Sequence, residues 1–340
     1  MGTIWMPPNQ FAAFFGERIG VKSGLALSRE EIVDHLGASD PVARAIISFS
    51  DAPMRLRANE ITDAFQLLLH KLGCLEQRFV GHGPTLLDLK YQSDPFNHKL
   101  FERVLSLLGS YHFDTGKVAL SDRFDKLAFY GIVRSTLPEN ALAIAIELVD
   151  LVELSERASP WDWFPARQFE WHQTLDLHEL FASESLNATH GTFFDQRFVN
   201  YLSANFEKIG EIHWRQFEAL AAEFFVRNGY QVEIGPGRND GGVDIRVWHA
   251  NSSIAHPPTI LVQCKRQKEK IGKVVVKALW ADVIDESARS GLIVTSSTLL
   301  PGADTVRRAR SYPINVIDRE ALRRWIENLR NPGKGIFLGW

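Results

Sequence analysis

Apolar residues along residues 211–330 recur with helical and strand-like spacing, and they predict an α/β domain. Residues 213–228 place apolar side chains three and four positions apart, as in a helix that packs through one face. The runs that follow are short, rich in β-branched residues and interrupted by helical stretches. The expected order is helix, three strands, helix, strand, helix, strand and helix, which is typical of a mixed sheet flanked by helices.

The preceding residues are patterned mainly as helices. Ser28 and Glu31 form a capping box at the start of the first of them. Glycine-containing segments at 81–84 and 109–117 are expected to interrupt the helical series. Helical spacing is clearest over residues 28–36, 40–49, 59–72, 94–108, 121–137 and 139–154.

The patterns predict a mainly α-helical N-terminal region over residues 1–205 and an α/β domain over residues 206–330. A C-terminal tail over residues 331–340 follows. Residues 195–212 predict a helix that leads directly into the α/β domain, with no flexible linker. We therefore expect two closely coupled domains.

Composition is that of a cytoplasmic protein. Of the 340 residues, 45% are hydrophobic, but none of them form an apolar run of about 18 residues that could span a membrane. The first residues lack the basic start and apolar core of a signal peptide. The two cysteines, Cys74 and Cys264, are too few and too far apart for a disulfide framework or a zinc site.

Charge is distributed unevenly along the chain. Residues 211–330 hold 18 Lys+Arg and 14 Asp+Glu (net +4), whereas residues 1–210 hold 19 and 27 (net −8). The α/β domain is therefore the expected nucleic-acid surface. The alternative is that its basic residues only form a solvated helix face. The candidates for contacts with DNA are Arg266, Lys268, Lys270, Lys273 and Lys277.

Two strand-like runs bring candidate catalytic side chains together. If they pair as an antiparallel hairpin with Trp248 opposite Thr259, Asp244 lies opposite Gln263, with Cβ atoms roughly 5 Å apart. Lys265 shares a face with Gln263, because side chains alternate along a strand.

Two further groups could complete this patch. Glu218 lies on the helix before the strands, and the backbone carbonyl of Cys264 could add an oxygen. Carboxylate and amide oxygens can hold Mg²⁺ or Mn²⁺ against a phosphodiester and activate water. Taken singly, each residue has an ordinary structural reading, but their order and spacing favour a nuclease site.

Several segments between residues 214 and 326 form a recurring combination of motifs: W-R-Q-F-E-A-L at 214–220, G-Y-Q-V at 229–232, D-G-G-V-D-I at 240–245, V-Q-C-K-R at 262–266, G-L-I-V-T-S at 291–296 and I-D-R-E-A-L at 317–322. Together they resemble the Mrr-like branch of the PD-(D/E)XK nuclease superfamily, which has the restriction-endonuclease-like fold. Gln263 replaces the usual acid before Lys265, as is common in that branch. The resemblance implies that Asp244 and Gln263 bind the metal ion and that Glu218 binds it or positions its water.

This resemblance implies a metal-dependent DNA endonuclease in bacterial restriction or anti-phage defence, working as a homo-oligomer (a dimer or higher). The N-terminal region would gate it in response to phage-derived or modified DNA. The aromatic residues Trp161, Trp163 and Trp171 are candidates for a sensing surface or, alternatively, an aromatic plug. Two other functions stay open: a structure-specific repair or junction nuclease, and a non-catalytic DNA-binding module with a nuclease fold.

Overall fold

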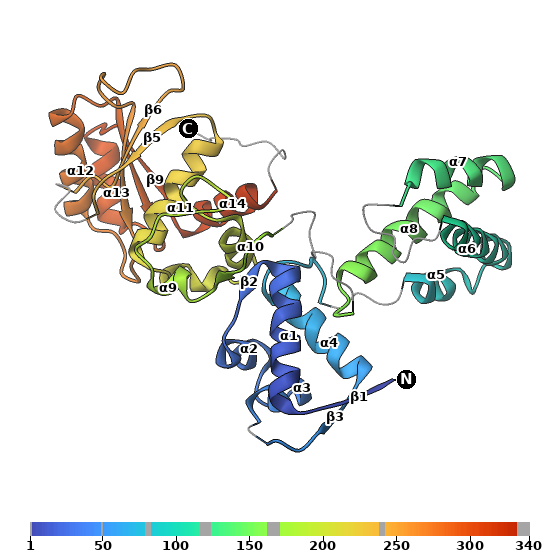
Figure 1. Ribbon diagram of the computed structural model, residues 1–340. Coiled ribbons are helices and arrows are strands. Elements are labelled where there is room, and N and C mark those ends of the chain that lie inside the picture. Colours follow the sequence, from blue (N-terminus) through green and yellow to red (C-terminus); the bar gives the residue numbers. More distant parts are fainter. Residues whose placement is uncertain are drawn as a thin grey trace. The chain divides into compact units, whose positions relative to one another are not determined.

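A computed structural model of the chain describes residues 2–48, 50–78, 83–115, 124–161, 171–237 and 242–331 (Figure 1). The chain divides into two compact units, Met1–Thr174 and Leu175–Trp340. The sequence pattern places the boundary after residue 205, whereas the two compact units divide about 30 residues earlier, after Thr174. In the described parts of the chain, no helix combines the length and the apolar character that a membrane span requires.

The second unit contains a five-stranded mixed sheet in the order β5-β6-β7-β8-β9. β6 runs antiparallel to both β5 and β7, whereas β7, β8 and β9 run parallel to one another. The succession of elements confirms the predicted order. They are α11 (Trp214–Arg227), β5 (Gln231–Ile234), β6 (Ile245–Trp248), β7 (Ile260–Lys265), α12 (Lys273–Asp285), β8 (Ser290–Thr295), α13 (Pro301–Ala309), β9 (Ile314–Ile317) and α14 (Arg319–Arg330).

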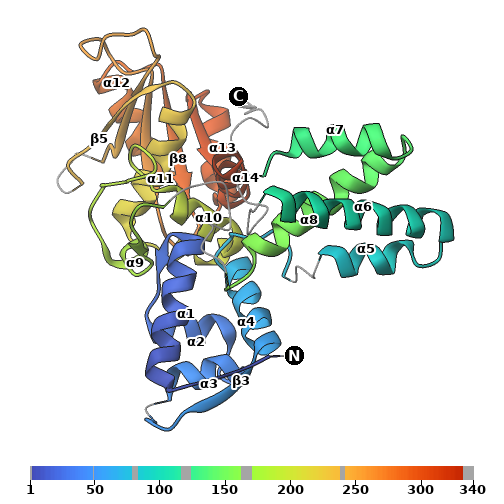
Figure 2. The ribbon, with the colours of Figure 1, turned by 45° about the vertical axis from the view of Figure 1, so that its right-hand side comes forward.

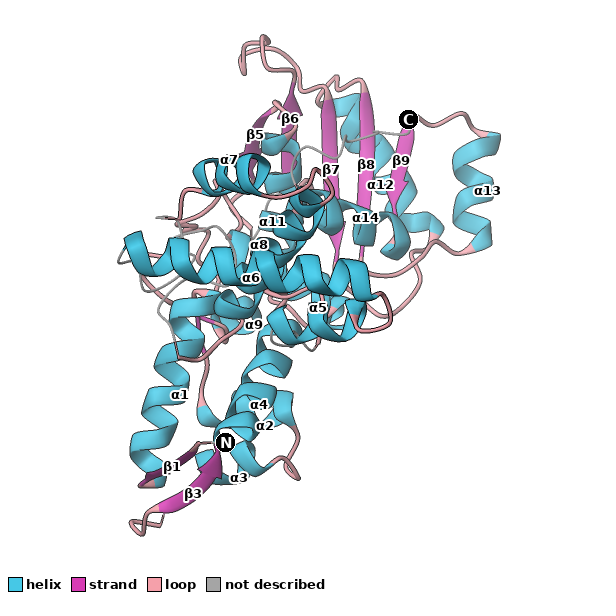
Figure 3. Ribbon diagram, turned by 90° about the vertical axis from the view of Figure 1, so that its right-hand side faces the viewer, coloured by secondary structure: helices cyan, strands magenta, loops and turns pink. Residues whose placement is uncertain are grey.

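Helices cover both faces of this sheet, with α12 and α13 on one face and α11 and α14 on the other (Figures 1 and 3). On the first face, Leu261 and Ile293 pack with Leu279 of α12 in one buried cluster. On the second face, Phe224 of α11 and Trp325 of α14 stack, with ring centroids 3.7 Å apart and planes 4° apart. The sheet is thus the middle layer of a three-layer core.

The expected hairpin register between β6 and β7 is confirmed. Ile245 pairs with Val262, and Val247 pairs with Ile260. Directly before β6, however, the N–H of Asp244 donates to the carbonyl of Val262, one position short of the Gln263 that this register predicts.

Residues 175–204 belong to the second unit, and several of them pack on its helices. The carboxylate of Glu223 in α11 is 1% exposed and accepts three consecutive backbone N–H groups at 2.7–3.2 Å. The donors are Thr192, Phe193 and Phe194. A buried carboxylate needs such partners, because leaving it unpaired is costly. We call residues 189–195 the cradle segment.

The rest of this stretch follows the same pattern. α10 (Gln196–Ala204) packs against α14 and ends at Asn205. A 3₁₀ helix, η1 (Phe206–Gly210), follows, so the single helix predicted over 195–212 is wrong. β4 (Leu175–Asp176) and α9 (Glu179–Ala182) precede the cradle segment.

The first unit begins with helices and a two-stranded antiparallel ribbon of β1 and β3. Its elements are β1 (Thr3–Met6), α1 (Pro8–Ser23), β2 (Leu25–Ala26), α2 (Arg29–Leu36), α3 (Pro41–Ile47), β3 (Met54–Arg57) and α4 (Ala58–Lys71). The capping box of Ser28 and Glu31 is confirmed at the start of α2. Trp161 stacks on Phe14 of α1, with centroids 6.0 Å apart. Trp163 and residues 332–340 lie outside the described residues.

The same unit continues with α5 (Gly83–Tyr91), α6 (Pro95–Thr115), α7 (Lys126–Thr136) and α8 (Ala141–Arg157), which pack together (Figure 2). The break predicted at Gly109 is wrong, because α6 continues through it to Thr115. One glycine costs a helix only about 1 kcal/mol, which the packing of Leu108 and its neighbours can offset. Gly83 and Pro84 start α5, where proline is favoured in the first turn.

Candidate active site

Asp244 lies directly before β6, where the pairing of β6 with β7 ends. Its backbone N–H donates to the Val262 carbonyl at 3.0 Å. Its carboxylate oxygen Oδ2 accepts the backbone N–H of Cys264 at 2.6 Å. Because a strand N–H lies in the plane of the sheet, the carboxylate is held in that plane, beside the half-buried end of β7.

Glu218 reaches Asp244 from α11. The Glu218 side chain is 4% exposed. Burial and the nearby Asp244 carboxylate, to which it is also hydrogen-bonded, raise the pKa of Glu218 to about 8, although Arg215 opposes the shift. At neutral pH without a cation, Glu218 therefore keeps a proton between the two carboxyl groups. A cation placed there would favour the ionised form.

Arg215 is a site residue that sequence reasoning missed. Its Nη1 donates to Glu218 Oε2 at 2.7 Å, three positions along α11. The i, i+3 spacing of opposite charges on a helix was the available signal. This contact fixes the Glu218 carboxyl at the site.

Gln263 has one side-chain atom with a partner and one without. Its side chain is 5% exposed, and Nε2 donates to the Gly242 carbonyl at 2.9 Å. A carbonyl can only accept, so this contact sets the orientation of the amide. Oε1 is then buried with no hydrogen-bond partner among the described residues. Such an orphaned acceptor costs roughly 1–3 kcal/mol unless something binds it.

The second glycine of the D-G-G motif, Gly242, has a structural reason. Its φ of +98° is a conformation that favours glycine, and a Cβ there would lie 3.5 Å from Gln263 Nε2. The same Cβ position lies 3.9 Å from Asp282 Oδ2 of α12. Asp282 is thus a further acid beside the site, and burial together with Glu286 and Asp285 raises its pKa. No local motif marked it.

The candidate residues approach Asp244 from both faces of the sheet. Leu261, Gln263 and Lys265 are two positions apart on β7, so their side chains share one face. This is the face on which Leu261 packs against α12. Glu218 comes from the other face. We expected one patch for Asp244, Gln263 and Lys265, but the Asp244 carboxylate turns into the plane of the sheet toward Cys264.

Cys264 contributes backbone atoms at this end of β7. Burial and the carboxylates of Asp244 and Glu218 raise the pKa of its thiol, so the sulfur stays protonated at neutral pH. The N–H and C=O of one antiparallel-strand residue face the same neighbour. The Cys264 carbonyl is therefore on the side of Asp244, as expected for a backbone ligand.

The comparisons with known proteins address this part of the chain. Residues 209–326 match the Mrr catalytic family, described as restriction endonuclease. These residues are an Mrr-type restriction endonuclease domain. Its family hydrolyses phosphodiester bonds and typically uses divalent metal ions.

One solved structure is also similar to the chain, the MspJI restriction endonuclease in complex with a 27-mer oligonucleotide. The identity is 16% and the TM-score is 0.28. The match covers 61% of this chain and 46% of that one, so this chain spans less than half of MspJI. No curated protein matches the chain.

The oxygen atoms of the Mrr domain fit a hard divalent cation. Asp244 and Glu218 offer carboxylates, Gln263 offers the orphaned Oε1, and Cys264 offers a carbonyl. Such a set suits Mg²⁺ or Mn²⁺ better than a softer metal. Within the described residues, no three His, Cys, Asp or Glu side chains gather as a metal site. The amide and backbone oxygens would therefore have to complete the set.

The basic residues predicted to contact DNA differ in their availability. Lys268, Lys270, Lys273 and Lys277 are exposed. Arg266 is half-buried, and its Nη1 donates to the Gly210 carbonyl at 2.9 Å, which ties β7 to η1. The lysines are thus the stronger candidates for phosphate contacts on the Mrr domain.

Proposed function

We propose that the chain is an endodeoxyribonuclease that uses Mg²⁺ or Mn²⁺. The observation that supports this most directly is the pair of carboxyl groups of Glu218 in α11 and Asp244 directly before β6. On the neighbouring strand β7, Oε1 of Gln263 is a buried acceptor without a hydrogen-bond partner among the described residues. A cation would offset the charge of the two carboxyl groups, and the amide oxygen of Gln263 could complete its ligands.

Each residue has a role that its position supports. Asp244, Glu218, Gln263 and the Cys264 carbonyl would hold the cation. When bound, Mg²⁺ lowers the pKa of water and offsets the charge that develops on phosphate. Lys265 is two residues beyond Gln263 on the same face, so its ammonium group can orient the attacking water and stabilise the phosphate charge. Arg215 holds Glu218 in place.

Cleavage assays test this function. The purified chain would be incubated with unmodified, methylated, single-stranded and branched DNA, in Mg²⁺ or in EDTA. We expect cuts in DNA that require Mg²⁺. Cleavage of branched DNA alone would favour a repair or junction nuclease. Binding without cleavage under every condition would favour a DNA-binding module.

We further infer that the first unit restrains or directs the nuclease in a bacterial cytoplasm, in response to phage-derived or modified DNA. Acidic residues are in excess in the first unit, with 22 Asp+Glu against 17 Lys+Arg over residues 1–174, which makes it a poor general DNA clamp but a suitable restraint. A homo-oligomer is expected, because one site cuts one strand.

Removing the first unit should leave cleavage active but unselective. The fragment should start at residue 175, because a start at 205 would remove the cradle segment and leave Glu223 buried without its N–H donors. We expect fragment 175–340 to cut with Mg²⁺ and to lose the discrimination of the whole chain between self-type and foreign-type DNA. The measurement is parallel digestion of both DNAs by both proteins. Equal discrimination would contradict gating by the first unit.

Lys273 and Lys277 on the exposed face of α12 are expected to bind phosphates. Replacing both with glutamine should weaken DNA binding for every sequence and reduce the slope of log affinity against log salt by about 1.8, at about 0.9 per contact. A matched control replaces Lys99 and Arg103, two exposed cations four positions apart on α6. An unchanged slope in the α12 variant would exclude this face from the DNA interface.

A further inference from the structure

The ribbon of β1 and β3 in the first unit carries a cationic and aromatic outer face. Trp5 pairs with Arg55, and Thr3 pairs with Arg57, so the four side chains lie on one face. Trp5 is 65% exposed, and both arginines are exposed. The alternate residues of the ribbon turn the other way, and Leu56 among them is buried.

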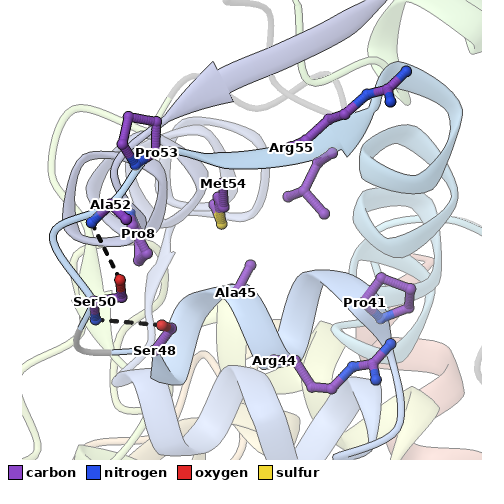
Figure 4. Close-up of a pocket in the computed structure, with 11 residues that line it drawn as sticks. Pro8, Pro41, Arg44, Ala45, Ser48, Ser50, Ala52, Pro53, Met54 and Arg55 are labelled. Atoms are coloured by element: carbon purple, nitrogen blue, oxygen red, sulfur yellow. Dashed lines mark hydrogen bonds between the residues drawn. The ribbon is translucent and has the colours of Figure 1, made fainter.

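A hollow of about 480 Å³ lies on the other side of the ribbon, between α3 and β3 (Figure 4). Arg44 projects from α3 on one side, and Arg55 projects from β3 on the other. Ala45, Met54 and Leu56 form an apolar floor between them. Arg44 and Arg55 thus stand at opposite rims of the hollow, with Arg55 on the outer face of the ribbon.

None of the arginines Arg44, Arg55 and Arg57 is ion-paired with a carboxylate among the described residues. By contrast, Arg215, Arg227 and Arg246 in the Mrr domain each bind a glutamate at 2.6–2.7 Å. The guanidinium of Arg55 instead lies 5.9 Å from the centre of the Trp5 ring, which holds it on the outer face. Three exposed guanidinium groups without a carboxylate ion pair among the described residues, in a unit with 17 Lys+Arg and 22 Asp+Glu over residues 1–174 (net −5), favour an anionic ligand.

The spacing of these groups fits nucleic acid. Two strand residues on one face are roughly 6.6–6.8 Å apart, close to the distance between successive phosphates of a DNA strand. A two-stranded ribbon is also narrow enough to enter the major groove. Guanidinium groups bind phosphate through two parallel hydrogen bonds. An acidic protein segment would also complement the positive charge of the arginines, but its binding would not require the shape of the ribbon.

We propose that Trp5, Arg44, Arg55 and Arg57, which we call the ribbon surface, bind the backbone of duplex DNA. The first unit would then contact the substrate directly instead of only restraining the nuclease. The choice of DNA as the anion rests on the proposed function, but the contact itself is independent of cleavage.

Binding in EDTA tests the ribbon surface without depending on catalysis. The full chain with Arg44, Arg55 and Arg57 replaced by glutamine should bind a duplex at least about tenfold more weakly at 0.1 M salt. Its salt slope should fall by about 2.7, at about 0.9 per lost contact. A control with Arg103→Gln and Arg134→Gln removes exposed arginines from α6 and α7 and should change neither value by as much as one contact. Wild-type affinity and slope in the triple variant would overturn the proposal, whether or not the chain cuts DNA.

Photo-crosslinking provides a readout that does not depend on charge. p-Benzoylphenylalanine in place of Trp5 should crosslink to bound duplex, whereas the same residue in place of Leu127, which is 82% exposed on α7, should not. Crosslinking at position 5 that is lost in the triple arginine variant would support a direct contact. Equal crosslinking at both positions, or none at position 5 while the duplex is bound, would overturn it.

Discussion

Asp244→Asn should reduce the rate of DNA cleavage by at least about 10³-fold, the scale expected when a charge-stabilising group is lost from a metal-assisted reaction. The amide can still accept the N–H of Cys264 through its oxygen, so β6 and β7 should keep their register. The substitution removes the negative charge that raises the pKa of Glu218 and that, in the proposed mechanism, would hold the cation. Single-turnover cleavage of a plasmid in Mg²⁺ measures the effect.

The control for this substitution is Asp285→Asn, which removes an exposed acid from α12. It should cut at close to the wild-type rate. DNA binding in EDTA should survive in both variants, because it depends on the basic residues. A folded Asp244→Asn variant that cuts within tenfold of wild type would remove Asp244 from the mechanism.

Two substitutions of Gln263, to alanine and to glutamate, should have different effects on the rate of cleavage. Gln263→Ala removes the orphaned oxygen and leaves the Gly242 carbonyl without its donor, so we expect a loss of about 10²-fold, in the range found for one stabilising group. Gln263→Glu restores the acid-x-lysine pair and should keep partial activity. Cleavage rates at increasing Mg²⁺ concentration distinguish the variants.

The glutamate variant has a second signature. Without a cation, its carboxylate faces the Gly242 carbonyl and should lower the thermal unfolding temperature, and Mg²⁺ should raise that temperature more than in wild type. Gln231→Glu on β5 adds an acid at an exposed position and serves as the control. Equal inactivity of the glutamate and alanine variants, with no difference in their response to Mg²⁺, would argue against a ligand role for Gln263.

The sequence was sufficient for the hairpin that carries Asp244 and Gln263. Alternation fixes which residues share a face, and the two runs are long enough to define one register. The ligand types and their order then indicated the chemistry. Arg215 was also within reach of sequence reasoning, because its partner lies three positions away on the same helix.

Other parts of the site depend on contacts between distant segments. The position of Asp282 beside Gly242 follows from how α12 packs on the sheet, and no spacing in the sequence encodes it. The turn of the Asp244 carboxylate toward Cys264 is likewise a detail of where β6 ends. The ribbon of β1 and β3 joins two four-residue strands from distant parts of the chain, so it has no local signature.

The boundary between the two units could not be predicted from the helical pattern of the sequence alone. Residues before 205 read as part of a helical series, and nothing in that series tells which helix packs on which core. The cradle segment decides it, because Glu223 in α11 is buried by accepting N–H groups from residues 192–194. Such a contact becomes visible only in three dimensions.

The stack of Phe224 on Trp325 has a consequence for how the protein is made. It joins the first helix of the Mrr domain to its last, and on the face of the sheet where α11 lies, the part over β8 and β9 is covered only when α14 packs on it. During synthesis, Glu218, Asp244 and Gln263 all leave the ribosome before Trp325 does. Because domains fold as units, a nascent chain held short of that tryptophan should lack a finished cutting centre. Translation itself would thus delay the hazard that an active nuclease poses to the genome of its own cell.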